Sequence, residues 1–403
     1  MHILMFSDQH ADSLGGVQVS IRLQKRFLEQ AGHTVTVCAP RMHREHPGDS
    51  DYVDTPSVPI TLDREYSMTL VGRRADRFID EALATRPPVD LVHVQADFWG
   101  AMLGYRFAQR HGIRAVHTFH NHMEFGIERV VPYPKLAVRG LLWWQHRLLK
   151  PARSALAPSA WSYLNELSLR ADAATAPSSH FASLLERKGA ASAVEVILTG
   201  ADDTVVEQVL REAGPRSTIR PMFVWMGRMS SEKRVLEYLD AIRLADVDAD
   251  FRLYGAGLLL TKAQAFVREN GLGDRVHFAG KVPYPEALAA IASADALVQT
   301  SIGFETQGMT VFEAAALGTP SIVSDPNIAG ELPDGIYWQP ADGSVQALAD
   351  ALVRVAADVA SGSKLVVEPQ TSSTFRQSHQ TERMIGVYER VLARRSAQPD
   401  SAV

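Results

Sequence analysis

The sequence predicts an α/β protein with two Rossmann-like, doubly wound domains. Short apolar runs alternate with longer amphipathic segments along the chain, which is typical of strands that alternate with helices. The alternation occurs in two cycles, and a polar stretch at residues 211–220 separates them. The chain has 403 residues, of which 46% are hydrophobic, and this is enough for two domains with separate cores. Such domains bind ligands at the carboxyl ends of their strands, so we expect a site in a cleft between the halves.

The first cycle begins with an apolar run at residues 2–6, which predicts a buried strand. A helix is expected over residues 20–30, because Ala31-Gly32 follows it as a stop signal. Further strands of this cycle are expected at residues 33–38, 91–94, 114–119, 172–176 and 194–198, and a helix at residues 99–111.

The second cycle begins with a strand at residues 222–226 and ends with an amphipathic helix over residues 381–395. Its other strands are expected at residues 251–254, 276–279, 296–300 and 321–323, and a helix at residues 309–317. The domain boundary is therefore expected near residues 205–220, with an N-terminal domain over residues 1–205 and a C-terminal domain over residues 216–377. We expect the tail after Ala397 to be disordered.

Composition argues against several classes of protein. The net charge is −5 and the pI is about 6.3, which gives no support for nucleic-acid binding. The single cysteine, Cys38, ends an apolar run, so we expect a buried thiol, no internal disulfide and a reducing compartment. The N-terminus turns polar after six residues, too soon for a secretion signal. No run approaches the roughly 18 apolar residues of a membrane span, and we therefore expect a cytoplasmic protein.

The most informative stretch of the chain is residues 301–324, where Glu305 and Glu313 flank the start of a predicted helix. Backbone N–H groups at a helix start attract anions, and a carboxylate one turn further in can bind vicinal hydroxyls. Hydrogen-bond donors for a phosphate group, with carboxylates beside them for hydroxyl groups, suit a nucleotide-sugar. The residues at this predicted helix start are Glu305, Thr306, Gln307, Gly308, Met309 and Glu313.

Two other loops follow strands at positions suited to phosphate binding. Gly227 allows close backbone approach, and Arg228 and Lys233 could neutralise a diphosphate leaving group. The alternative for a lone arginine and lysine is a solvated surface loop. Gly15-Gly16 precedes the first helix, where glycines let the chain pass close to a phosphate or sugar, although a plain turn explains them too.

A polar cluster with three histidines, His117, His120 and His122, lies at and beyond the end of a predicted strand. The nearby acids, Glu124 and Glu128, lack the spacing of a metal site, so we predict no metal. His120 is expected to contact a sugar or to handle a proton, with a structural histidine as the alternative.

Residues 129–165 contain no acid and combine basic residues with tryptophan and leucine. This pattern is typical of an interfacial helix on anionic lipid, and the alternative is a helix that covers the sheet with a wet basic face. The candidate membrane contacts are Lys135, Arg139, Trp143, Trp144, Arg147 and Lys150.

These motifs resemble a known family. Glu305 with Glu313 is similar to the Glu-x7-Glu signature of retaining GT-B glycosyltransferases, which include sucrose synthase and phosphatidylinositol mannosyltransferases. Gly227-Arg228 through Lys233 is similar to the Gly-Arg-x4-Lys element of that family. The resemblance covers nearly the whole chain, from Gly15-Gly16 to the final helix.

A narrower resemblance links residues 305–308 and the run from His117 to His120 to bacterial diacylglycerol glucosyltransferases and related glycolipid synthases. Glu124 belongs to this second match and would contact the acceptor or sugar. In that group, a basic helix of the first domain docks on the membrane. One departure from the family is the usual Asn-Gly-Val-Asp turn, which reads Thr199-Gly200-Ala201-Asp202 here and weakens any role of the asparagine.

The resemblance also implies roles. Glu313 would bind the ribose hydroxyls, and Arg228 and Lys233 the diphosphate. Glu305 would bind the donor sugar with the backbone of residues 306–309, Gly16 would lie near the phosphate, and His120 would lie near the sugar at the reaction centre. In this family the acceptor hydroxyl attacks from the face that the diphosphate leaves, without a protein nucleophile. No metal cofactor is required, and a C-terminal helix (about residues 378–398) crosses back to the first domain.

The expected function is a retaining glycosyltransferase that moves a hexose from a nucleotide-sugar of the UDP-glucose or GDP-mannose type to a lipid acceptor such as diacylglycerol. We expect it to be peripheral on the anionic inner face of the cell membrane. One alternative keeps the chemistry on a soluble acceptor, an inositol phosphate or a glycan, and another is a non-catalytic nucleotide-sugar-binding module. Donor base and sugar, acceptor head group and oligomeric state stay open.

Overall fold

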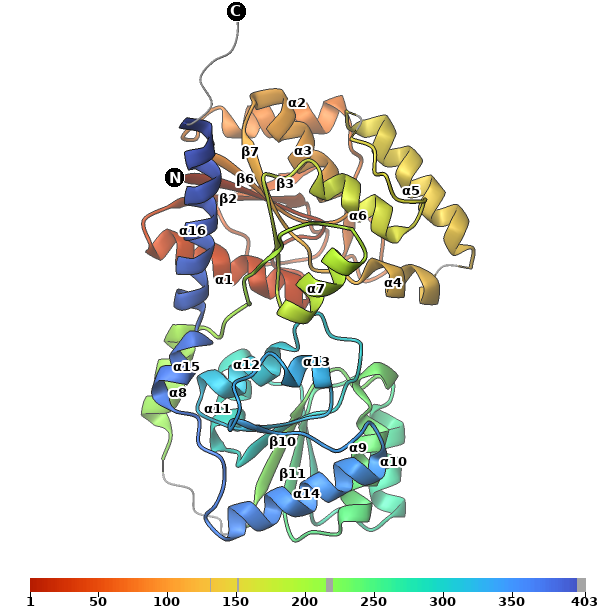
Figure 1. Cartoon of the computed structure of the whole chain (residues 1–403), viewed down its shortest axis with the longest axis vertical. Helices are drawn as coiled ribbons and strands as arrows, with labels where there is room; N and C mark the ends of the chain where they lie inside the picture. The colour runs from red at the N-terminus through yellow and green to blue at the C-terminus, as the bar shows by residue number, and fades with distance from the viewer. Residues whose placement is uncertain (131, 151, 215–219, 397–403) are drawn as a thin grey trace, which may run out of the picture. The chain divides into compact units, whose positions relative to one another are not determined.

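The computed structural model describes residues 1–130, 132–150, 152–214 and 220–396 (Figure 1). The chain divides into two units: the first comprises Met1–Thr199 together with the chain from Gln380 onward, and the second comprises Gly200–His379. The division falls at Thr199–Gly200, a few residues before the predicted end of the first domain at residue 205. The last helix, α16 (Gln377–Ser396), begins in the second unit and continues in the first. Residues 397 and 398 of its predicted extent, and the tail that we expected to be disordered, lie outside the described residues.

The first unit contains a seven-stranded parallel sheet in the order β3-β2-β1-β6-β7-β8-β9. Its strands are β1 (His2–Ser7), β2 (Thr34–Pro40), β3 (Tyr52–Thr55), β6 (Leu91–Gln95), β7 (Arg114–Thr118), β8 (Ala173–Ala176) and β9 (Glu195–Val196), and a hairpin of β4 (Ser57–Pro59) and β5 (Ser67–Thr69) follows β3. Its helices are α1 (Gly16–Gln30), α2 (Arg73–Leu83), α3 (Trp99–His111), α4 (Met123–Val130), α5 (Pro134–Leu148), α6 (Ala160–Ser168) and α7 (Ser179–Arg187).

The two faces of this sheet bury separate cores, because successive strand side chains point to opposite faces. On β1, Leu4 and Phe6 join a core with the α3 side chains, whereas Ile3 and Met5 join a core with α1 and α16. Layers of helices on both faces make the doubly wound arrangement that the sequence predicts. Cys38 is buried as predicted, and burial raises the pKa of its thiol.

The second unit contains a six-stranded parallel sheet in the order β12-β11-β10-β13-β14-β15. Its strands are β10 (Met222–Met226), β11 (Asp250–Tyr254), β12 (Val276–Gly280), β13 (Ala296–Gln299), β14 (Ser321–Val323) and β15 (Tyr337–Trp338). Its helices are α8 (Asp203–Glu212), η1 (Ser231–Lys233), α9 (Val235–Ala245), α10 (Leu260–Glu269), α11 (Tyr284–Ser293), α12 (Met309–Ala316), α13 (Pro326–Ala329), α14 (Val345–Ala360) and α15 (Pro369–Thr374). None of the helices in the described ranges has the length and apolar character that a membrane crossing requires.

Candidate functional site

The loops after β10 and β13 meet at the carboxyl end of the second sheet. Lys233 Nζ forms an ion pair with Glu305, and the Ser301 hydroxyl donates to the same carboxylate at 2.9 Å. Thr300 Oγ1 donates to the Lys233 carbonyl at 2.6 Å and accepts from the Trp225 indole at 2.9 Å. The structure therefore brings together two predicted site residues that lie 72 positions apart.

Arg228 lies in the same loop, is exposed, and forms no ion pair with a described residue. Gly227 donates its N–H to the Tyr254 carbonyl at 3.1 Å. The backbone of Gly255 then passes so close that a Cβ there would lie 1.9 Å from the Gly227 carbonyl oxygen. Sequence reasoning missed this Gly255-Ala256-Gly257 segment, although a pair of glycines directly after strand β11 is a readable signal for close backbone approach.

The turn before α12 depends on Gly308, which caps the helix with φ of +81°. The conformation favours glycine, and a Cβ at Gly308 would lie 2.8 Å from Ile328 Cδ1, so the buried Ile328 side chain would have to shift. Met309 then begins the helix, and the Val311 N–H donates to the Gly308 carbonyl at 3.1 Å. No side chain caps this helix start, where backbone N–H groups favour an anion.

Gly308→Ala is expected to destabilise the second unit by about 1–2 kcal/mol more than a matched glycine substitution does. Gly271→Ala is the control, since Gly271 also has a positive φ, of +65°, but no atom would lie within 4 Å of a Cβ added there. Urea unfolding of both variants measures the difference. If both variants lost the same free energy of unfolding, the Ile328 side chain would move away from the new Cβ without a measurable cost in stability.

Glu313 lies on α12 with only 9% of its surface exposed. Burial raises the pKa of its carboxyl to about 7, although the nearby Tyr284 hydroxyl lowers it. The Tyr284 hydroxyl oxygen is itself buried and has no hydrogen-bond partner of normal geometry among the described residues. Glu313 is thus a desolvated carboxyl group that forms no side-chain hydrogen bond of normal geometry with the described residues, and its oxygens can accept from hydroxyl groups of a ligand.

In the first unit, the loop after β1 ends at Gly15, whose φ of +149° favours glycine. A Cβ added at Gly15 would lie 2.2 Å from Gln18 Oε1. Helix α1 begins at Gly16, four residues before the predicted helix start. The β4–β5 hairpin holds this loop, because Leu14 N–H donates to Glu65 at 2.7 Å and the Tyr66 hydroxyl donates to the Leu14 carbonyl at 2.8 Å.

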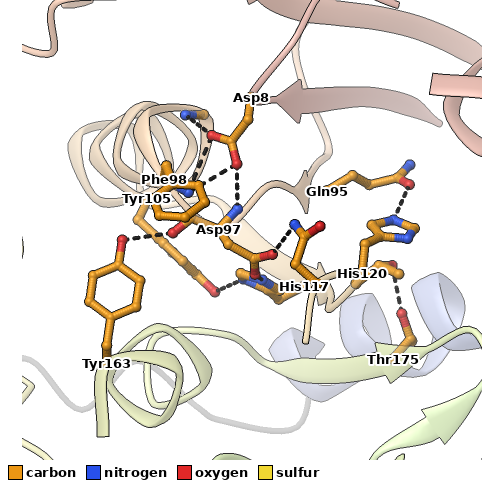
Figure 2. A network of polar contacts seen from close by, with 12 residues as sticks. Asp8, Gln95, Asp97, Phe98, Tyr105, His117, His120, Tyr163 and Thr175 are labelled. Carbon is orange, nitrogen blue, oxygen red and sulfur yellow. Dashed lines mark hydrogen bonds and ion pairs between the residues drawn. The ribbon is translucent and has the colours of Figure 1, made fainter. Parts of the chain in front are cut away.

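The histidine cluster separates into residues with different surroundings (Figure 2). His117 is fully buried between the Tyr105 hydroxyl, 2.8 Å from its Nδ1, and Asp97, 3.6 Å from its Nε2, so it is a structural histidine. His120 is half-buried, and its Nε2 lies 3.1 Å from Gln95 Oε1. Burial lowers the pKa of His120 to about 4, so its ring is neutral at pH 7. Glu124 on α4 lies 3.6 Å from Lys188.

Two carboxylates of this region, the half-buried Asp8 and the buried Asp97, were missed by the sequence reasoning. Asp8 accepts backbone N–H groups of Asp97 at 2.7 Å, Phe98 at 3.0 Å and Gly100 at 2.8 Å, and so caps the start of α3. Burial and the Asp97 charge raise the pKa of Asp8 to about 7. An acid directly after the first strand was the available signal, but its partners lie about 90 positions away.

Among the described residues, one group has the composition of a metal site: His10, Asp12 and His46. Both ring nitrogens of His10 already have partners, since Nδ1 accepts the Asp12 N–H at 3.1 Å and Nε2 lies 3.1 Å from Asp54. A metal ion would have to displace one of these contacts. The absence of a required metal stays a prediction.

Helix α5 presents one exposed stripe along its length. Trp143 has 68% of its surface exposed and Leu136 has 64%, and basic residues lie beside them. The exposed basic residues are Lys135, Arg139, Arg147 and Lys150. Trp144, which we also predicted to contact the membrane, is half-buried and packs against the core. Adjacent helical positions point about 100° apart, so the two tryptophans cannot both face outward.

Comparison with known proteins gives matches over both units. Residues 14–205 match the family profile of Glycosyltransferase Family 4, and residues 220–358 match that of Glycosyl transferases group 1. The chain is 26% identical to the alpha-monoglucosyldiacylglycerol synthase of Streptococcus pneumoniae, over 80% of this chain and 70% of the relative. It is also 26% identical to the 2-deoxystreptamine N-acetyl-D-glucosaminyltransferase of Streptomyces fradiae, over 77% and 74% of the two chains. The fold is similar to sucrose-phosphate synthase of Thermosynechococcus elongatus, with a TM-score of 0.68 and 19% identity over 98% of this chain and 100% of that chain.

Proposed function

We propose that this chain, which belongs to the nucleotide-sugar-dependent glycosyltransferases of the GT-B fold, transfers a hexose to a lipid acceptor at a membrane surface. The donor we propose is of the UDP-glucose or GDP-mannose type. The configuration at the anomeric carbon is retained, because the acceptor attacks from the face that the diphosphate leaves. The similarity to an alpha-monoglucosyldiacylglycerol synthase supports a glycerolipid acceptor.

The proposed chemistry rests on charge at the second sheet. A breaking glycosyl–phosphate bond builds negative charge on the diphosphate, and fixed cations stabilise that charge most in the transition state. Arg228 and Lys233 would supply two such cations, and for this reason we propose that transfer requires no metal ion. Glu305 would release Lys233 to the diphosphate and accept hydrogen bonds from the sugar hydroxyls. Glu313 would bind the ribose.

The observation that carries the lipid acceptor is the exposed stripe of α5. Exposed tryptophan and leucine beside four basic residues suit the boundary between head groups and acyl chains of an anionic bilayer. The decisive experiment incubates the protein with labelled UDP-glucose or GDP-mannose and diacylglycerol in anionic vesicles. Absence of transfer from any nucleotide-sugar to any lipid would refute the lipid acceptor.

Arg139→Gln/Arg147→Gln is expected to weaken binding to phosphatidylglycerol vesicles about 30-fold, at about 1 kcal/mol for each charge near the surface. The measurement is vesicle flotation at low and raised salt, since salt screens this attraction. The control is Lys262→Gln/Arg268→Gln, which removes two exposed charges from α10 in the second unit. If both pairs weaken flotation equally, net charge and not α5 governs binding.

A soluble acceptor is the second candidate, and the similarity to a 2-deoxystreptamine N-acetyl-D-glucosaminyltransferase favours it. On this alternative the protein stays off anionic vesicles even at low salt and transfers its sugar to an aminocyclitol or a glycan in free solution. A thermal-shift screen of UDP, GDP and their sugars identifies the donor in either case, because a bound ligand stabilises the folded state.

A further inference from the structure

A chain of buried polar side chains leads from His120 into the core of the first unit. His120 Nε2 lies 3.1 Å from Gln95 Oε1, a contact visible in Figure 2. Gln95 Nε2 donates to Gln24 Oε1 at 3.2 Å, and Gln24 Nε2 donates to Ser20 Oγ at 3.4 Å. Thr199, the last residue of the unit before the chain crosses to the second, donates its hydroxyl to Ser20 at 2.9 Å. Gln95 and Gln24 are 1% and 4% exposed, so these contacts are shielded from water.

The surroundings of Gln95 fix which end of its amide faces His120. The Met5 sulfur, which can only accept a hydrogen bond, lies 3.6 Å from Gln95 Nε2. The Gln95 amide NH₂ therefore donates to Met5 and Gln24, and the Gln95 carbonyl oxygen faces His120. A carbonyl oxygen only accepts, so the His120 Nε2 must carry the proton of the neutral ring. Nδ1 is then the unprotonated nitrogen, and it has no hydrogen-bond partner among the described residues.

We propose that Gln95 is a positioning residue that holds His120 in its Nε2–H tautomer, so that Nδ1 accepts a hydrogen bond from a sugar hydroxyl. This inference rests on the proposed function for the identity of the ligand, but the tautomer itself is a property of the free protein. A neutral ring with a fixed acceptor recognises a hydroxyl group and does not act as the acid that protonates a leaving group at pH 7.

A purely structural role for Gln95 is the competing explanation. A buried glutamine with all its hydrogen bonds made is tolerated in a core, and its loss would then cost stability only. The two explanations differ in what they predict for folded Gln95→Met, because a purely structural role leaves the His120 tautomer unchanged, whereas a positioning role does not. The ring state is therefore the quantity to measure.

The experiment is ¹⁵N NMR of histidine-labelled full-length protein, with the His120 signals assigned by their absence in His120→Gln. The wild type is expected to show His120 protonated at Nε2, and Gln95→Met, which removes the acceptor at similar volume, is expected to show a mixture of tautomers. Gln145→Met is the control, because Gln145 is also fully buried in the first unit but donates to the Tyr163 carbonyl. An unchanged His120 tautomer in folded Gln95→Met overturns the proposal.

A second variant, Gln95→Glu, keeps the shape and the acceptor but adds a charge. A carboxylate at this position favours the charged ring, so the pKa of His120 should rise from about 4 in a pH titration of its NMR signals. The titratable groups that interact with the ring, Asp97, His117 and His93, are unchanged in this variant. No rise in the pKa would mean that residue 95 does not contact the ring in solution.

Kinetics then separate this inference from the proposed function. Gln95→Met is expected to lower kcat/KM for sugar transfer by about 10- to 100-fold while the affinity for the free nucleoside diphosphate is unchanged. If the wild type transfers no sugar at all, the proposed function fails, yet the NMR result still decides the tautomer. If transfer occurs and Gln95→Met retains full kcat/KM, the positioning role fails and the proposed function stands.

Discussion

Arg228→Ala is expected to lower the turnover number of sugar transfer by about 10²–10³, and to weaken binding of the nucleotide-sugar much less. Arg228 is exposed and forms no ion pair with a described residue, so it has no structural contact of this kind to lose. On the proposed function, its guanidinium would bind the diphosphate as charge develops during bond cleavage. The measurement is kcat and KM together with the dissociation constant of the nucleoside diphosphate.

The control for this prediction is Arg243→Ala, which removes an exposed arginine from α9 that pairs with Asp240 on the same helix. Its kinetics should match those of the wild type. Arg228→Lys keeps a charge but loses the planar fork, and intermediate activity would indicate that bidentate contact with phosphate matters. If Arg228→Ala raises the dissociation constant as much as it lowers kcat/KM, Arg228 acts in ground-state binding and our assignment is wrong.

The central strands of both sheets could be predicted because they are buried on both faces. Parallel strands of this kind are continuous apolar runs, and the run at residues 222–226 is strand β10 as predicted. The predicted edge strand at residues 194–198 is shorter than expected, because only Glu195–Val196 forms strand β9. The elements that we missed lack this signal. β3 lies at the sheet edge and alternates the half-buried Tyr52 and Asp54 with the buried Val53 and Thr55, and β15 is only two residues long. Edge strands depend on neighbours that a local pattern does not reveal.

The candidate site also has parts that a local sequence pattern predicts and parts that it does not. The spacing of Glu305 and Glu313 and the Gly227–Lys233 loop are local patterns, and the sequence therefore indicates them. The chain from His120 through Gln95 to Ser20 combines side chains from three separate elements, and Asp8 caps a helix that begins about 90 residues later. Such contacts exist only after the sheet has formed. Trp144 was predicted to contact the membrane but packs against the core, because composition alone cannot tell which of two adjacent tryptophans faces the core.

The affinity for the nucleoside diphosphate is expected to fall as the pH decreases through about 7, and Glu313 is the cause. Burial raises the pKa of the Glu313 carboxyl to about 7 in the free protein, so half of the molecules are protonated there. An ionised carboxylate accepts from both ribose hydroxyls, whereas a protonated one loses acceptor capacity. Below about pH 7, protons therefore compete with the ligand, and the affinity falls by up to tenfold for each pH unit.

Glu313→Gln isolates this effect. The amide has nearly the shape of the acid but does not titrate. We therefore expect this variant to bind the nucleoside diphosphate more weakly at pH 8 and with a much flatter pH dependence. Any pH dependence that remains comes from titration of the phosphate of the ligand. Calorimetric titration between pH 5.5 and 8 measures both, on the order of one pH unit either side of the midpoint.

The stability of the folded protein depends on pH in the opposite direction to its ligand affinity. Because the pKa of Glu313 is raised in the folded state, the stability that the protonated acid contributes is complete below the unfolded pKa and is lost as the pH rises through about 7. Glu313→Gln should therefore be more stable than the wild type at pH 8 and nearly equal to it at pH 4. If ligand affinity and stability both fell at pH 8 in this variant, Glu313 would be a residue that holds the fold and not one held ready for the ribose.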